Sequence, residues 1–157
     1  MKAVLLVVGK TDEPFVMEGI NKYLNRITKY MPFEFDVIPD VKNTKNMQHE
    51  LQKEKEGELI LKKLQPGDIM ILLDEKGEMH SSVGFANWLN GIFISSFKRL
   101  VFVIGGPYGF SSQVYSKCQG KISISKMTFS HQMIRLVFVE QFYRAHTILK
   151  GEPYHHE

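Results

Sequence analysis

The chain has 157 residues, a length that fits one domain and can bury a core without disulfides. Its apolar fraction of 43% and charged fraction of 24% are typical of a soluble protein, and no apolar run is long enough to span a bilayer. The net charge of +3 is compatible with a polyanionic partner. The one cysteine excludes an internal disulfide and argues against a structural zinc site. We therefore expect a metal-free cytoplasmic protein.

Short apolar runs alternate along the chain with longer amphipathic stretches. The runs predict strands at Lys2–Val8, Phe33–Ile38, 69–73, 100–104 and 121–125. The stretches between them predict helices at 13–30, 43–64, Ser82–Ile94, 111–117 and 130–149, with a turn at 74–77. This alternation indicates one α/β domain over residues 1–157, with a mainly parallel sheet flanked by helices.

The last predicted helix, at residues 130–149, begins after a natural N-cap residue, Ser130. It is apolar around more of its circumference than a one-sided surface helix needs. A helix that is buried in the core explains this breadth, and so does a helix that packs on the sheet with one face and on a second subunit with the other. We favour the second explanation, which predicts a homodimer.

A glycine-rich pentapeptide, Gly-Gly-Pro-Tyr-Gly at 105–109, follows the fourth predicted strand. Glycines at the carboxyl end of a strand let a ligand approach the backbone closely, and ligands of open α/β sheets bind at this edge. A tight turn that needs positive φ explains the pentapeptide equally well. A dinucleotide site is excluded because the spacing is not G-x-G-x-x-G and no acidic residue follows for a ribose.

Two features near the C-terminus allow a structural and a functional interpretation. Arg144 follows Glu140 by four residues, which predicts a helical ion pair or a cation held for a phosphate or base. The tail at 151–157 contains Tyr154 and His155, which suit base stacking or proton transfer unless the tail is a frayed end. His146 is interpreted as a surface or core histidine.

The ordered set of motifs closely resembles the large-subunit ribosomal RNA methyltransferase H family, of the SPOUT class. The resemblance covers essentially the whole chain. It is carried by Leu-Leu-Asp-Glu-Lys-Gly at 72–77, Phe-Val-Ile-Gly-Gly-Pro-Tyr-Gly at 102–109, Ser-Ile-Ser-Lys-Met-Thr-Phe-Ser-His-Gln-Met at 123–133, Glu-Gln-Phe-Tyr-Arg-Ala at 140–145 and Gly-Glu-Pro-Tyr-His-His at 151–156.

The resemblance implies a homodimer with a C-terminal trefoil knot that methylates N3 of a pseudouridine in 23S ribosomal RNA. The methyl donor would be S-adenosylmethionine (SAM), and the substrate would be the assembled ribosome. The residues that match the family's cofactor pocket are Leu73, Gly105, Ile124, Ser125, Lys126, Met127, Thr128 and Phe129. Those that match its reacting surface are Arg144, Tyr154 and His155, with Glu140 in support.

The chemistry of the implied reaction gives each of these polar groups an expected role. His155 is the candidate base for the N3 proton, and Arg144 is placed to stabilise an oxyanion at a flanking carbonyl. Tyr154 would hydrogen-bond to the base or stack on it. A non-catalytic RNA-binding factor is the alternative, and it would need no SAM pocket.

Overall fold

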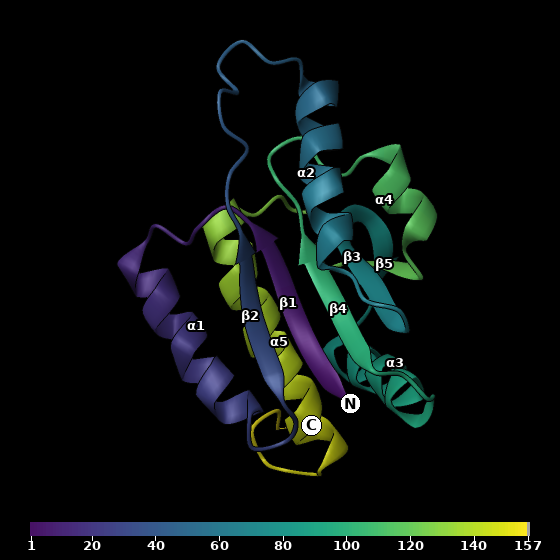
Figure 1. Ribbon diagram of the computed structural model, residues 1–157. Helices are drawn as coiled ribbons and strands as arrows, with labels where there is room; N and C mark the ends of the chain where they lie inside the picture. The colour runs from purple at the N-terminus through teal and green to yellow at the C-terminus, as the bar shows by residue number, and fades with distance from the viewer. Residues whose placement is uncertain (157) are drawn as a thin grey trace.

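The computed structural model describes residues 1–156, so Glu157, the last residue of the predicted tail, lies outside the described part. Strands and helices alternate along the chain (Figure 1). The strands are β1 (Lys2–Val8), β2 (Phe33–Ile38), β3 (Asp68–Met79), β4 (Arg99–Ile104) and β5 (Gly120–Ser123). The helices are α1 (Pro14–Ile27), α2 (His49–Lys63), α3 (Ser82–Ile94), α4 (Ser112–Lys117) and α5 (His131–Leu149).

The five strands form one parallel sheet in the order β2-β1-β4-β3-β5. Helices α1, α3 and α5 cover one face, and α2 and α4 cover the other. Because the side chains of a strand alternate between its faces, β1 supplies both layers: Leu5 packs under α5 and Leu6 under α2. The predicted α/β class with a flanked parallel sheet is confirmed.

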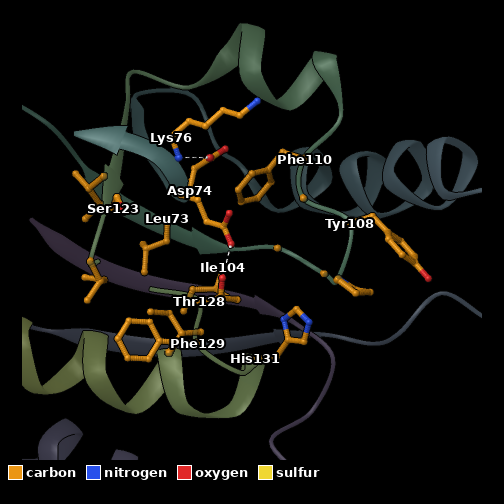
Figure 2. A pocket seen from close by; sticks show the side chains of 18 of the residues that line it. Leu73, Asp74, Lys76, Ile104, Tyr108, Phe110, Ser123, Thr128, Phe129 and His131 are labelled. Carbon is orange, nitrogen blue, oxygen red and sulfur yellow. Dashed lines mark hydrogen bonds between the residues drawn. The ribbon is translucent and has the colours of Figure 1, made fainter. Parts of the chain in front are cut away.

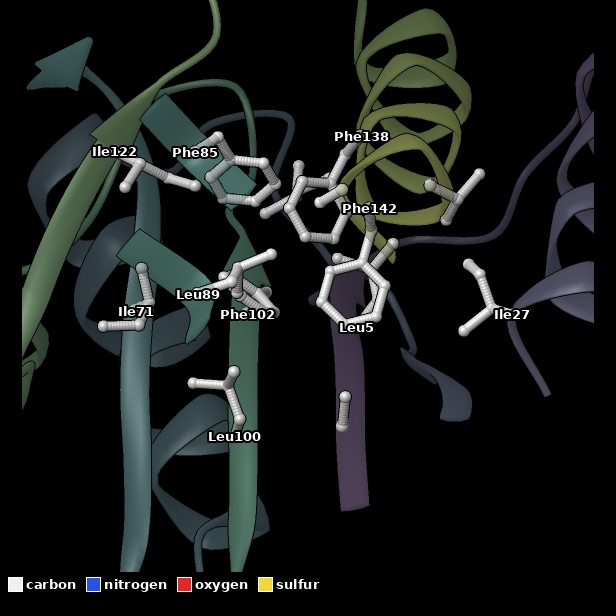
Figure 3. Close-up of a cluster of buried hydrophobic side chains, with 14 of the residues drawn as sticks. Leu5, Ile27, Ile71, Phe85, Leu89, Leu100, Phe102, Ile122, Phe138 and Phe142 are labelled. Atoms are coloured by element: carbon white, nitrogen blue, oxygen red, sulfur yellow. The ribbon is translucent and has the colours of Figure 1, made fainter. Parts of the chain in front are cut away.

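Aromatic rings fill the larger of the two cores, between the sheet and α5 (Figure 3). Phe102 of β4 lies 4.8 Å from Phe138 and 5.7 Å from Phe142, measured between ring centroids. His146 belongs to the same layer: it is buried, stacks on Tyr30, and burial lowers its pKa to about 4. This histidine is therefore a neutral core residue.

Two predicted elements are wrong in their extent. The helix predicted at 43–64 spans only His49–Lys63, and Asn43, with a φ of +61°, lies outside the conformation of an α-helix. The turn predicted at 74–77 belongs to β3, which continues to Met79 through an irregularity opposite β5. Gly77 packs directly on the backbone of Ile122 there, and a Cβ atom would lie 2.5 Å from the Ile122 carbonyl carbon.

Helix α5 lies on the sheet between α1 and α3. Its N-cap is Ser130, as predicted, because the Ser130 hydroxyl accepts a hydrogen bond from the backbone of Met133 at 3.1 Å. The middle of the apolar arc of α5 is buried against the sheet and both neighbouring helices. Several apolar side chains at its margins are only partly buried in the single protomer, namely Met133, Ile134, Leu136, Val137, Tyr143, Ile148 and Leu149. The homodimer therefore stays a prediction.

Candidate active site

A cavity of about 620 Å³ opens at the carboxyl ends of β3, β4 and β5 (Figure 2). Parallel strands end at the same edge of a sheet, so segments distant in sequence meet there. Three segments form most of the wall: residues 73–76 of β3, the glycine turn from Ile104 to Phe110, and residues 122–129 except Lys126. The remaining lining residues are Lys53 of α2, Tyr115 of α4, and His131 and Ile134 in the first turn of α5.

The glycine turn passes between α2 and the cavity with no room for side chains at its first two positions. A Cβ atom on Gly105 would lie 2.9 Å from the Phe110 ring, and one on Gly106 would overlap the carboxyl group of Glu56. The turn ends at Ser111, whose hydroxyl accepts from the backbone of Val114 and caps α4. The turn thus exposes backbone atoms of Gly105 and Gly106 to the cavity.

The structure places seven of the eight sequence-predicted cofactor residues on the cavity wall. The exception is Lys126, which sits in the same loop but does not line the cavity. Short-range hydrogen bonds hold this loop: the Ser125 hydroxyl accepts from the Met127 backbone at 3.0 Å, and the Ser123 hydroxyl donates to the Ser125 carbonyl at 3.0 Å. The loop therefore has a defined shape without a ligand.

Several lining residues were not singled out from the sequence. Asp74 accepts hydrogen bonds from the Tyr115 hydroxyl and, at 2.8 Å, from the Lys76 backbone. Burial and the bond to Asp74 raise the pKa of Tyr115, so its phenol stays protonated. Glu75 accepts from the Thr128 hydroxyl at 3.4 Å and bridges the two sides of the cavity. Asp74 and Glu75 belong to the motif at 72–77 that carries the family resemblance, but the sequence does not indicate that their side chains line the cavity.

A second group of polar side chains gathers at the other end of α5, where the tail folds back on the helix. Arg144 donates to Glu140 from Nε at 3.1 Å and from Nη2 at 2.6 Å. The Tyr154 hydroxyl donates to the same Glu140 oxygen at 2.9 Å, and the Arg144 guanidinium lies 4.7 Å from the Tyr154 ring centroid. Nη1 of Arg144 is 3.1 Å from Nδ1 of His155.

The predicted ion pair of Arg144 with Glu140 is present, and the tail that carries Tyr154 and His155 is held against it. We call Glu140, Arg144, Tyr154 and His155 the tail cluster. Tyr23 of α1 extends it, since its hydroxyl lies 3.4 Å from that of Tyr154. Burial raises the pKa of Tyr154, and its bonds to Tyr23 and Glu140 act in the same direction, so Tyr154 is a hydrogen-bonding phenol.

The cavity and the tail cluster lie far apart within one chain. Ile134, the last residue that lines the cavity, and Arg144 are separated by 10 positions of the same helix. At 1.5 Å per residue this is about 15 Å, several times the length of a bond being made or broken. No residue of the tail cluster lines the cavity of the same protomer.

Within residues 1–156 no helix is both long and apolar enough to cross a bilayer. The same residues contain no group of three His, Cys, Asp or Glu side chains placed to hold a metal ion.

The sequence matches a protein family described as "Predicted SPOUT methyltransferase" over residues 1–155. It is 62% identical to a protein of Parabacteroides distasonis, 59% to one of Bacteroides fragilis and 55% to one of Flavobacterium johnsoniae. Each comparison spans 157 residues and the full length of both chains. All three relatives carry the name ribosomal RNA large subunit methyltransferase H.

Proposed function

The chain belongs to the SPOUT methyltransferase family, and from this premise we propose that it methylates N3 of a pseudouridine in large-subunit ribosomal RNA. We further propose that SAM is the methyl donor, that the substrate is the assembled ribosome, and that the active form is a homodimer in the cytoplasm. The names and full-length similarity of the relatives support the substrate class. The observation that carries the proposal is the cavity formed by the glycine turn and residues 122–129.

The residues of the cavity suit SAM. The volume of about 620 Å³ lies in the range of small-molecule sites. Leu73, Ile124 and Phe129 supply apolar walls for an adenine ring, and the bare backbone at Gly105 allows close approach. Asp74 and Glu75 supply negative charge for a cationic donor. When bound, SAM supplies a methyl group that its sulfonium has already activated.

A homodimer resolves the separation of about 15 Å between Ile134 of the cavity and Arg144 of the tail cluster. In a symmetric pair, each cavity can face the tail cluster of the other protomer, so that two composite sites form from two chains. Cyclic dimers are the commonest oligomers. In such a dimer the cavity of one protomer can meet the tail cluster of the other without a change of conformation in either chain. We therefore propose that the cavity and the tail cluster act in trans. The trefoil knot expected from the family is part of the same proposal.

The tail cluster suggests how the N3 proton is removed. Arg144 always carries its positive charge, so it donates to Nδ1 of His155, and a neutral His155 ring then carries its proton on Nε2. We propose that a carbonyl oxygen of the pseudouridine takes over this N–H of Arg144. Nδ1 of His155 then accepts the N3 proton, while Arg144 stabilises the charge that develops on the carbonyl oxygen.

The other two members of the tail cluster position these groups. Glu140 holds the guanidinium through two hydrogen bonds and accepts from Tyr154. With its oxygens occupied by donors, Glu140 is a poorer proton acceptor than His155. The Tyr154 ring, packed edge-on to Tyr143 with 4.8 Å between centroids, presents an aromatic surface beside the guanidinium.

The proposed function is tested by two measurements on the purified protein. Calorimetric titration with SAM is expected to show specific binding. Incubation with ribosomes that lack the modification is expected to add one methyl group to a large-subunit pseudouridine, located by mass spectrometry, and to do so far better than incubation with naked ribosomal RNA. A protein that binds ribosomes but not SAM would instead be an RNA-binding factor, and the proposal would fail.

A further inference from the structure

A buried carboxyl group lies directly behind the glycine turn. Glu56 extends from α2 and is 3% exposed, although it is a charged residue type. A Cβ atom built on Gly106 would lie 2.0 Å from Glu56 Oε2 and 2.7 Å from Oε1. The carboxyl group therefore occupies the space where Gly106 would carry a side chain. Gly106 lines the cavity, whereas Glu56 stands behind it.

The surroundings of this carboxyl group disfavour a negative charge. Its Oε1 is buried and has no hydrogen-bond partner within residues 1–156. An ionised carboxylate without donors in such a place is costly. Burial raises the pKa of Glu56 to about 7, and the negative charge of Asp40 adds to the increase. The group is therefore neutral below that pH and becomes charged in the range where cells operate.

The charged groups around Glu56 come from several elements. Asp40, after β2, acts on it directly. Arg135 of α5 is 2% exposed, donates to the Val8 carbonyl at 2.8 Å, and is itself acted on by the charge of Asp40. Lys53, one turn earlier on α2, lines the cavity. Oε1 of Glu56 has no donor within residues 1–156, so a negative charge on this oxygen would lack a hydrogen bond.

We propose that Glu56 is a positioning residue for the methyl donor: its neutral carboxyl group supports the Gly105-Gly106 turn from behind, and a charge on it displaces the turn and weakens donor binding. The turn is the part that can respond, since Gly105 and Gly106 belong to no helix or strand. The inference rests on the proposed function, because it takes the cavity to be the SAM site.

The decisive variant is Glu56→Gln, which keeps the shape of the side chain but cannot ionise. If the neutral form alone binds, the dissociation constant of the wild-type protein for SAM rises about tenfold between about pH 6 and about pH 8, in step with the falling neutral fraction. The same constant in Glu56→Gln is expected to stay nearly level. Glu58→Gln, an exposed position on the same helix, removes the same charge and is expected to behave like the wild type.

The outcomes separate this inference from the function on which it rests. Equal pH dependence in the wild type and Glu56→Gln would overturn the role of Glu56 and leave the SAM site intact. No SAM binding by the wild type at any pH would overturn the proposed function instead. If Glu56→Gln does not fold, NMR of the wild type decides: the amide shift of Gly106 must titrate together with the Glu56 carboxyl carbon, and independent titration would contradict the proposal.

Discussion

Removing residues 154–157 is expected to abolish methylation of ribosomes and to leave SAM binding within about twofold of the wild type. The deletion takes away Tyr154 and His155, and it leaves Arg144 with Glu140 as its partner. The last residue of the cavity wall, Ile134, lies about 15 Å from Arg144 along α5. Methylation rates and calorimetric SAM titration of the same preparation provide the measurement.

Single substitutions show how much of the lost methylation is due to Arg144 and how much to His155. Arg144→Ala is expected to cost on the order of 3 kcal/mol of transition-state stabilisation, or roughly a hundredfold in rate, as for the loss of one oxyanion donor.

His155→Ala is expected to lower turnover more than SAM affinity, with the largest loss below neutral pH if another base serves at high pH. A chain that ends after His155 is the matched control and should stay active. If the protein without residues 154–157 methylates ribosomes at the normal rate, Tyr154 and His155 have no role in catalysis.

Gly105→Val is expected to weaken SAM binding by roughly ten- to a hundredfold in a protein that still folds. A Cβ atom at this position already meets the Phe110 ring at 2.9 Å, so the two methyl groups of valine must either push that ring aside or enter the cavity. Calorimetric titration with SAM provides the measurement, and circular dichroism and thermal unfolding establish that the variant is folded.

Lys126→Ala is the matched control for the cavity. Lys126 lies in the same loop as the predicted cofactor residues but does not line the cavity, so its side chain is expected to be dispensable for SAM affinity. Unchanged SAM affinity in folded Gly105→Val would show that the glycine turn is not part of the donor site. A large loss in Lys126→Ala would mean that the loop closes differently around the ligand.

Local patterns in the sequence predict most of the fold and the location of the cavity. The buried strand of Lys2–Val8 and the N-cap at Ser130 follow from apolar runs and capping chemistry, which act over a few residues. Leu73, Gly105 and residues 124–129 meet because parallel strands end at one edge of the sheet. The alternation of elements predicts the parallel direction of the strands but not their order, and the individual cofactor residues follow from the family resemblance.

Contacts between distant segments could not be predicted in this way. Residues 74–77 look like a turn because they are polar, but Gly77 lies on the backbone of Ile122 and keeps β3 extended. Glu56 looks like one more solvated glutamate of a charged helix, whereas in the fold it is buried and its carboxyl group lies against Gly106. The apolar arc on α5 predicts a second subunit; α1 and α3 cover part of the arc, and the dimer stays a prediction.

Action of the cavity and the tail cluster in trans is tested most directly by a heterodimer of two impaired variants, Gly105→Val and Arg144→Ala. The two chains carry different affinity tags and are co-expressed, and tandem purification isolates the mixed dimer. Its one intact composite site combines the cavity of the Arg144→Ala chain with the tail cluster of the Gly105→Val chain. At a SAM concentration below the dissociation constant of the wild type, we predict about half of the wild-type methylation rate per dimer, while each parent homodimer keeps about a tenth of that rate or less. A mixed dimer as inactive as its parents would contradict the account, because the cavity and the cluster would then have to act within one chain.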